Sequence, residues 1–245
     1  MSDFHEKESS NPVCKEIRQA LKSHANSRRA KFNASIAPEI DSSRFLGLLR
    51  PQIQEIAKKV DPDSARVFLQ DLPHEYYEED MLHVLLLNQI RDPKEAEREV
   101  DEFLPYITSW AIADSLRFQK LSDHDLLSLA RVYLDKDSPY AKRLGILWIL
   151  CRGLKRDDAD KWVDLALQAD ADGEIDQLSA MKGWMLCEAM IVNPKTALPR
   201  IEDEALALPV RRKAISKCMD SKRIDAKTKE HLRAVRNSFG RKITR

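Results

Sequence analysis

Two tryptophans and an arginine occur at intervals of about one helical repeat. They are Trp110, Arg143 and Trp184, and the gaps between them are 33 and 41 residues. Asp114 follows Trp110 by four residues in SWAIADSL, so on a helix its carboxylate lies beside the indole on one face. An indole face and a carboxylate both attract positive charge. The coincidence of all four residues at repeat spacing favours a functional site.

Each candidate also has a purely structural interpretation. A tryptophan at helical spacing is more often core than site, and we expect Trp148 and Trp162 to be core residues. The two tryptophans of the candidate site could be core as well. Asp114 could be an ordinary surface or capping residue. Arg143 lies among small and apolar neighbours in YAKRLGIL, and it could pair with a carboxylate on the next helix.

Other catalytic chemistry is poorly represented. His83 in EEDMLH does not complete an HExxH zinc motif, the GxxxxGK[ST] and GxSxG motifs are missing from the sequence, and the six histidines do not cluster along it. The four cysteines are far apart and form no CxxC pair, so neither a zinc site nor a disulfide framework is expected. We expect no metal and no cofactor.

The elements that would position these residues are helices. Only 6 of 245 residues are glycine, which hairpins, phosphate loops and doubly wound sheets use heavily. Apolar residues recur at intervals of three and four in EEDMLHVLLLNQI and HDLLSLARVYLDK, whereas no convincing strand pattern is present. Helices should begin near Pro12 and within SRRAKFNASI. Further prolines mark helix starts or joints: Pro51, Pro62, Pro93, Pro139, Pro194 and Pro209.

About a dozen short helices with short joints predict an all-α fold, an α-solenoid of HEAT-like repeats of roughly 35 to 45 residues. We expect a disordered or loosely ordered tail at 1–11 and a single repeat domain over 12–245. Equivalent points of successive repeats lie side by side, so the four candidate residues should converge on the concave face. Gly183 should leave the backbone beside Trp184 open.

Composition excludes two broad classes. Charged residues make up 33% of the chain and its mean hydropathy is −0.49, which fits neither a disordered polyelectrolyte nor a membrane protein. The longest apolar runs, such as LGILWILC, are too short to span a bilayer, and MSDFHEKESSNP has no apolar core of a signal peptide. A cytoplasmic protein is therefore expected.

Charge is concentrated at the C-terminal end. The whole chain carries +1, but residues 211–245 hold 13 basic and only three acidic residues, a local charge of +10. This asymmetry suggests an end that contacts phosphates, beginning at Arg211, Arg212 and Lys213. The alternative is a solvated basic helix whose charges have no specific partner.

Seven segments together resemble one known family. They are LKSHANSRRAKFNASI, FLGLLRPQIQEIAKK, EYYEEDMLHVLLLNQI, SWAIADSL, YAKRLGIL, SAMKGWMLCEAM with its following NP, and RRKAISK. From about Ile17 to Phe239 the chain is similar to the DNA alkylation repair family, the AlkD-type HEAT-like alkylpurine DNA glycosylases. The order and spacing of the last four segments carry most of the resemblance.

The resemblance implies a role for each candidate residue. Trp110 and Trp184 match the family's cleft tryptophans, Asp114 its catalytic aspartate, and Arg143 an arginine of that cleft that contacts DNA. The implied activity is base excision repair, in which a glycosylase hydrolyses the N-glycosidic bond of N3- or N7-alkylated purines. The implied partner is double-stranded DNA with alkylated bases, bound by a monomer near the nucleoid.

Two departures from the better understood glycosylases leave alternatives open. Those enzymes have an acidic residue soon after the first tryptophan and an arginine three residues after the second, where this chain has Ala111, Ile112 and Cys187. The WAxxD motif is similar to that of a less characterised branch of the family. One alternative is a family member that binds distorted DNA without cleavage. Another, motivated by the near-zero total charge, is a HEAT-type protein scaffold.

Overall fold

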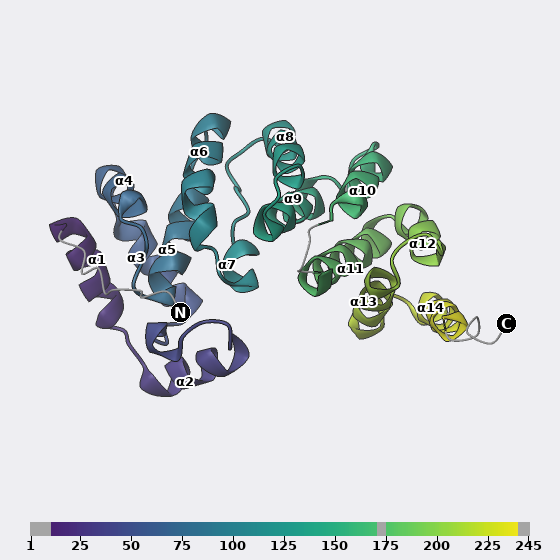
Figure 1. Cartoon of the computed structure of the whole chain (residues 1–245), viewed down its shortest axis with the longest axis horizontal. Helices are drawn as coiled ribbons and strands as arrows, with labels where there is room; N and C mark the ends of the chain where they lie inside the picture. The colour runs from purple at the N-terminus through teal and green to yellow at the C-terminus, as the bar shows by residue number, and fades with distance from the viewer. Residues whose placement is uncertain (1–10, 171–174, 240–245) are drawn as a thin grey trace. The chain divides into compact units, whose positions relative to one another are not determined.

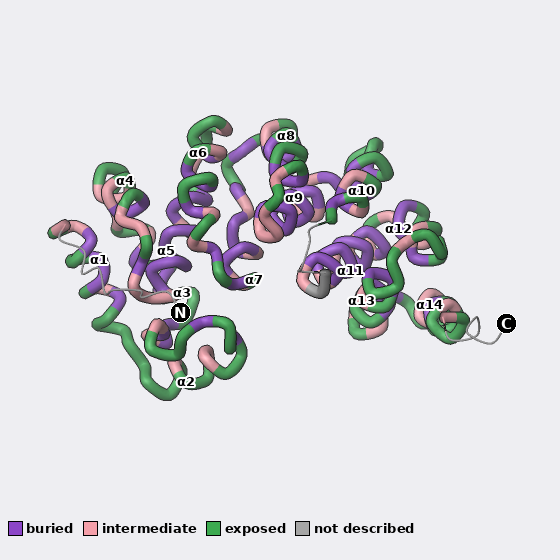
Figure 2. Tube along the Cα trace, in the orientation of Figure 1, coloured by how far each residue is buried: buried purple, intermediate pink, exposed green. Residues whose placement is uncertain are grey.

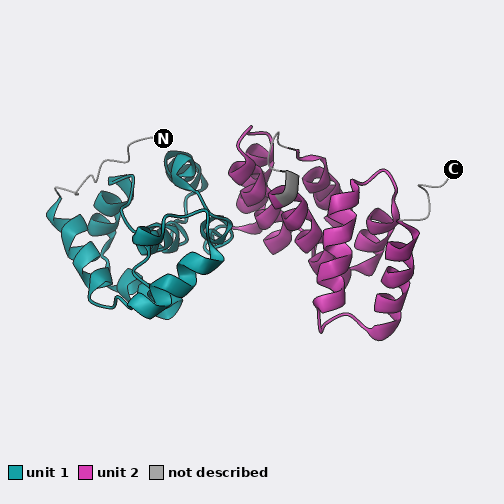
Figure 3. Ribbon diagram, turned by 60° about the horizontal axis from the view of Figure 1, so that its bottom comes forward, with its two compact units in different colours: residues 1–121 teal, residues 122–245 magenta. Residues whose placement is uncertain are grey.

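The chain is almost entirely helical in a computed structural model that describes residues 11–170 and 175–239 (Figure 1). Those ranges contain fourteen α-helices, two short 3-10 helices and no strand, which confirms the all-α prediction. The contacts divide the chain into two compact units, Met1–Leu121 and Ser122–Arg245 (Figure 3). Each unit is described by itself.

Unit 1 contains seven α-helices, and they pack on helices that are nearby in the chain. The helix α5 is central to them, because α1, α3, α4, α6 and α7 all contact it. The helices are α1 (Pro12–Lys22), α2 (Ser27–Ile36), α3 (Arg50–Lys59), α4 (Pro62–Gln70), α5 (Tyr77–Leu87), α6 (Pro93–Phe103) and α7 (Trp110–Ala113), with η1 (Ser42–Arg44) and η2 (Leu104–Tyr106) as the 3-10 turns.

Unit 2 contains the other seven helices in two layers. The helices α9, α11 and α13 pack side by side, α8 packs on α9, and α10 and α12 pack across the joints of that row (Figure 1). This alternation is the packing expected of solenoid repeats. The helices are α8 (Asp123–Leu134), α9 (Pro139–Arg152), α10 (Ala159–Gln168), α11 (Ile175–Val192), α12 (Pro194–Glu202), α13 (Leu208–Asp220) and α14 (Ala226–Ser238).

Proline and side-chain caps set the helix starts. All six marker prolines lie in the first two positions of a helix, as predicted, where no backbone N–H is needed for the helical ladder. Asp61, Asp92 and Ser138 accept hydrogen bonds from the N–H groups of the first turn that follows each of them. Local sequence therefore determines where the repeats begin.

Trp148 and Trp162 are core residues, as predicted, whereas the two tryptophans of the candidate site are not fully buried. Trp148 is 0% exposed and packs edge-on against Tyr133, with 4.9 Å between ring centroids, and Trp162 is 8% exposed. Trp110, in contrast, is 48% exposed. Trp184 is half-buried. Figure 2 shows how the buried positions form the inner faces of the helices in each unit.

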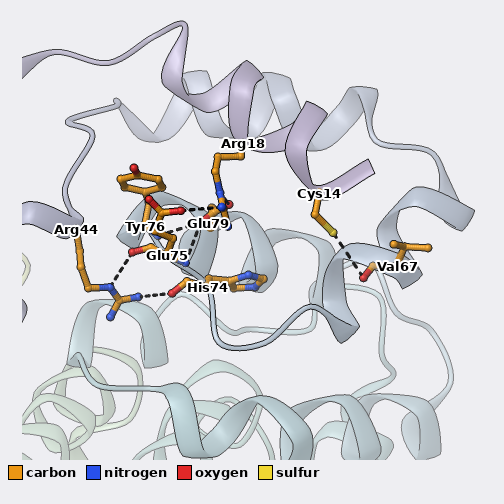
Figure 4. Close-up of polar contacts among 8 residues, drawn as sticks. All are labelled: Cys14, Arg18, Arg44, Val67, His74, Glu75, Tyr76 and Glu79. Carbon is orange, nitrogen blue, oxygen red and sulfur yellow. Dashed lines mark hydrogen bonds and ion pairs between the residues drawn. The ribbon is translucent and has the colours of Figure 1, made fainter. Parts of the chain in front are cut away.

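Three consecutive acids at the start of α5 are buried and hold unit 1 together. Glu79 pairs with Arg18 of α1 at 2.8 Å, and Asp80 pairs with Arg44 at 2.8 Å. Arg44 also donates to the carbonyl oxygens of His74 and Glu75, and Figure 4 shows this network between α1 and the segment before α5. Burial raises the pKa of Asp80 to about 7, although the charge on Arg44 opposes the rise.

The third acid, Glu78, secures the segment between η1 and α3. Its carboxylate accepts hydrogen bonds from the backbone N–H groups of Leu46, Gly47 and Leu48 at 2.7 to 3.2 Å. Gly47 has φ +81, and a Cβ there would lie 2.3 Å from the carbonyl oxygen of Asn26. Only glycine fits this turn, because both its φ and its surroundings reject a side chain.

Two histidines that are separate in the sequence come together in unit 1. His74 Nε2 and His83 Nδ1 are 2.9 Å apart, a contact that their spacing along the sequence did not predict. Their rings stack on Phe68 and Phe103, respectively. Burial lowers the pKa of His74 to about 3 and that of His83 well below its ordinary value. Both rings are therefore neutral at physiological pH.

The predictions about chain organisation have different outcomes. The expected tail at 1–11 lies outside the described residues except for Asn11, whose side chain accepts from the N–H of Val13 at 2.9 Å and caps α1. The single repeat domain over 12–245 stays a prediction, because the contacts define two units. In the described ranges no helix is long and apolar enough to cross a bilayer.

Candidate functional site

The exposed tryptophan of unit 1 begins a helix of a single turn. Ser109, which is fully buried, caps α7 by accepting from the N–H of Ala111 at 3.2 Å. Trp110 is the first residue of this helix, and Ile112 and Ala113 are buried beneath it. The short helix therefore presents an indole at the surface while its other side chains anchor it.

Asp114 closes the same turn. Its N–H donates to the carbonyl oxygen of Trp110 at 2.9 Å, and its own carbonyl oxygen accepts from Arg117 Nε at 3.0 Å. The residue is half-buried at the C-terminus of α7. A carboxylate and an indole thus occur on one helical turn at the surface of unit 1, as the spacing predicts.

Asn88, which sequence reasoning missed, fixes the segment after Asp114. It caps α5, is buried, and its Oδ1 accepts from the N–H groups of Arg117 and Phe118, both at 2.7 Å. Its Nδ2 donates to the carbonyl oxygen of Ser115 at 2.9 Å. Phe118 has φ 42, so this amide holds a turn with an unfavourable backbone conformation. An asparagine at the end of an apolar helix was the available signal.

A second polar contact joins α7 to α3. Ser115 Oγ donates to the carbonyl oxygen of Ala111 at 2.8 Å and accepts from Arg50 Nη1 at 3.1 Å. The end of the segment that follows Asp114 is thus hydrogen-bonded through Ser115 to α3 and to the residue that caps α5. The arrangement places a carboxylate at the surface with little backbone freedom.

The half-buried tryptophan of unit 2 lies in the middle of an eighteen-residue helix and has charged neighbours. Trp184 Nε1 donates to Glu188 Oε1 at 3.4 Å, and Lys217 Nζ lies 6.0 Å from the centroid of the indole ring. Arg223 forms an ion pair with the same glutamate. The tryptophan therefore lies where positively charged residues of α13 and of the turn after it approach α11.

Gly183 has a different role from the one expected. It is buried, and a Cβ at this position would lie 2.7 Å from Lys213 Cβ and 2.8 Å from the backbone nitrogen of Ala214. The backbone beside Trp184 is therefore covered by α13, and the expectation that it is open is wrong. Glycine is needed because the two helices approach closely at this point.

Arg143 is buried in the described structure of unit 2. It lies in α9, is 7% exposed, and its Nη1 donates to the carbonyl oxygen of Gln177 in α11 at 3.1 Å. Arg143 thus contacts the next helix in the row, as the alternative interpretation expected, and this contact is made to a backbone carbonyl where a carboxylate was expected. A role of Arg143 in DNA contact stays a prediction.

Cys187 fills the position where the better understood glycosylases have an arginine. It lies one turn after Gly183 and is buried against Cys218 of α13, whose contact lowers the pKa of the Cys187 thiol. Gly183 lies against Ala214, and four residues later Cys187 contacts Cys218, so α11 and α13 run in the same direction. A thiol here packs two helices together and presents no positive charge.

The three basic residues at the start of the C-terminal segment differ in their surroundings. Arg211 is buried, donates to the carbonyl oxygens of Ile201 and Glu202 at 2.8 and 3.1 Å, and lies 4.4 Å over the ring of Phe239. It therefore caps the C-terminal end of α12. Arg212 is exposed and Lys213 is half-buried.

The structure thus brings the candidates together in two groups. Trp110 and Asp114 share a turn in unit 1, whereas Arg143, Trp184 and the basic residues of α13 lie in unit 2. Within the described part of the chain, His, Cys, Asp and Glu residues form no cluster of three or more that could hold a metal ion. Convergence of the two groups on one concave surface stays a prediction.

Residues 17–218 match the family described as DNA alkylation repair enzyme, which is most of the chain. The chain belongs to this family. Membership gives the protein a role in the repair of alkylated DNA and DNA as its partner. Among curated proteins no sequence matches the chain significantly.

The family match covers every candidate residue from Trp110 to Lys213. It ends at Cys218 in α13, whereas we expected the likeness to continue to Phe239. The helix α14 therefore lies beyond the segment that defines membership of the DNA alkylation repair family.

Proposed function

We propose that the protein is a DNA glycosylase that excises cationic N3- or N7-alkylated purines from duplex DNA. The observation that carries the proposal is the division of the tryptophans. Trp148 and Trp162 are core, while Trp110 is exposed on the same short turn as Asp114. Exposure leaves the indole face accessible to a cationic nucleotide, and the carboxylate lies on the same turn.

The residues of this turn suit the chemistry of a cationic lesion. Alkylation at N3 or N7 gives the base a positive charge, so it is a good leaving group that needs no protonation. As the glycosidic bond breaks, positive charge develops on the sugar. The Asp114 carboxylate offsets this charge and orients the water that attacks the sugar. Two indole faces, Trp110 and Trp184, hold the cationic nucleotide, each contributing about 0.5 to 2 kcal/mol.

Phosphates of the duplex provide the rest of the binding energy. Arg212 and Lys213 contact the DNA backbone in this proposal, and Arg143 of α9 adds a further contact. Arg211 contributes by holding the end of α12 and the start of α13 in place. Such contacts bind without reading sequence. The protein acts as a monomer in the cytoplasm, at the nucleoid, without a metal or cofactor.

The decisive experiment compares wild type with Asp114→Asn in single-turnover base release from a duplex containing N7-methylguanine. The amide keeps the shape of the carboxyl group and removes its charge, so release should slow about 10²- to 10³-fold while DNA affinity stays nearly constant. A duplex containing uracil should release no base with either protein, because a neutral base needs a general acid. Equal rates for both proteins on the methylated duplex would exclude Asp114 from the mechanism.

A second candidate function rests on Cys187. Because this position is buried and uncharged, a family member without the usual arginine could bind distorted DNA and leave the glycosidic bond intact. Wild type that binds the methylated duplex tightly but releases no base would favour this candidate. Binding that hardly changes with salt would favour the protein scaffold instead.

A further inference from the structure

We propose that α14 carries a stripe of basic side chains, Lys229, Arg233 and Arg236, that contacts DNA phosphates beyond the part of the chain that matches the family. This inference rests on the proposed DNA-binding function and extends its surface to a helix that the match does not cover.

The three residues share one face of the helix. They recur at intervals of four and three, so their side chains follow one another along α14. Arg233 and Arg236 are exposed and Lys229 is half-buried, and Figure 2 shows most of α14 as exposed or half-buried. Leu232 is the one fully buried side chain among the described residues of this helix. The stripe can therefore change without removing the contact that packs α14 on α13.

No carboxylate of the described residues forms an ion pair with Arg233 or Arg236. Two acids near this end are engaged with other residues, because Glu202 pairs with His231 and Glu188 pairs with Arg223. Positive side chains that cluster without acidic partners repel one another, so the stripe is stabilised when phosphates approach it. A duplex presents such phosphates at regular spacing.

Lys229, the first residue of the stripe, lies toward the contact of α11 with α13. The pKa of the Cys218 thiol is raised, mainly by its contact with Cys187 and by burial, and the charge on Lys229 acts against that rise. Lys229 is therefore near the contact of α11 with α13, where Glu188 receives the indole N–H of Trp184. The basic face of α14 thus continues the charged surface beside the tryptophan.

The opposite side of α14 provides a matched control. His231 points toward α12, because it pairs with Glu202 at the end of that helix. Lys227 is four residues before His231 and on its side of the helix, and it is exposed. Changing Lys227 to glutamate removes two units of positive charge, as does changing both arginines of the stripe to glutamine. The two variants have the same net charge and alter opposite faces of α14.

The experiment measures binding of a methylated duplex by fluorescence anisotropy over a range of KCl concentrations. The variant Arg233→Gln/Arg236→Gln should reduce the slope of log affinity against log salt by about 1.8, which is about 0.9 for each of two lost phosphate contacts. Lys227→Glu should leave the slope close to that of wild type. Base release at saturating protein should be the same for all three, because the stripe acts in binding.

Three other outcomes are distinct. An unchanged slope in the arginine variant would overturn the inference while wild-type binding upheld the proposed function. Equal reductions in both variants would also overturn it, because net charge alone would then explain the effect. Wild type that fails to bind DNA would remove the proposed function and the stripe with it. Circular dichroism of each variant checks that α14 remains helical.

Discussion

The two tryptophan regions are held in place by different kinds of interaction. In unit 1, Trp110 lies on a helix of one turn whose position depends on hydrogen bonds from Ser109, Ser115 and Asn88. In unit 2, Trp184 lies within a long helix that is fixed by close packing at Gly183. Hydrogen bonds fix the orientation of the short helix α7, whereas close packing fixes the position of α11 along its contact with α13.

The difference extends to the cores of the units. Unit 1 buries Glu78, Glu79, Asp80 and two neutral histidines, and most of these groups have hydrogen-bond partners. Unit 2 buries an apolar row of α9, α11 and α13 around Trp148, and the charged residues buried in its described part are all basic: Lys142, Arg143, Lys182 and Arg211. Removing one partner of a buried polar group lowers stability. Adding side-chain atoms between close-packed helices lowers it as well. The two units should therefore fail for different reasons.

The largest effect should come from Asn88→Ala. This change leaves the N–H groups of Arg117 and Phe118 and the carbonyl oxygen of Ser115 without their partner, which should lower the free energy of unfolding by about 2 to 4 kcal/mol. Displacement of Asp114 should also slow base release by about 10²-fold. Urea denaturation and single-turnover assays measure the two effects.

Asn88→Asp is the matched control, because its carboxylate can still accept from both N–H groups but cannot donate to Ser115. It should have an intermediate effect on both measurements. Full activity and stability of Asn88→Ala would show that the amide does not position the segment carrying Asp114.

Gly183→Ala should have the next largest effect, and in unit 2. The added Cβ meets the backbone of α13, so its overpacking cost of about 1 to 3 kcal/mol should exceed the gain of about 1 kcal/mol from helix propensity. Urea denaturation followed by tryptophan fluorescence reports the loss. Lys213→Gly removes one of the clashing atoms, and in a double-mutant cycle it should recover more than about 0.5 kcal/mol. A more stable Gly183→Ala protein would contradict the close approach.

The smallest effect is the pH dependence of stability that unit 1 gives the wild-type protein. His74 has a folded pKa of about 3, below its usual 6.5, so the unfolded chain takes up the proton first and stability falls as pH drops below 6.5. His83 acts in the same direction. Asp80, with a folded pKa of about 7 against 3.8, is protonated first in the folded state and gains stability as pH falls from 7. The two effects oppose each other.

Between pH 7.5 and 5 His74 should cost about 2 kcal/mol, His83 should add to this loss, and Asp80 should offset about 3 kcal/mol, so the stability of wild type should change little. Asp80→Asn removes the offset, so its free energy of unfolding should fall by about 3 kcal/mol more than that of wild type over the same range. Urea denaturation at the two pH values measures this difference. A pH dependence equal to that of wild type would show that Asp80 is not protonated in this range.

Local sequence determined the helices and the division of the tryptophans. Helices begin where proline occupies a first position and where Asp61, Asp92 or Ser138 caps the first turn. Proline has no N–H that a helix start would leave unpaired, and the caps accept hydrogen bonds from the N–H groups that follow them. Periodic apolar residues placed Trp148 in the core. The four-residue spacing likewise placed Trp110 and Asp114 on one turn.

Tertiary structure alone decided which polar and basic residues are structural. Arg211 and Arg212 are adjacent in sequence, yet one is buried on the carbonyl oxygens of α12 and the other is exposed. The His74–His83 contact, the capture of the turn after Asp114 by Asn88 and the closeness of α13 to Gly183 likewise join residues that are distant in sequence. Composition and periodicity report the side of a helix on which a residue lies. The hydrogen-bond partner of a buried polar group depends on which helix packs there, and that is fixed only when the chain folds.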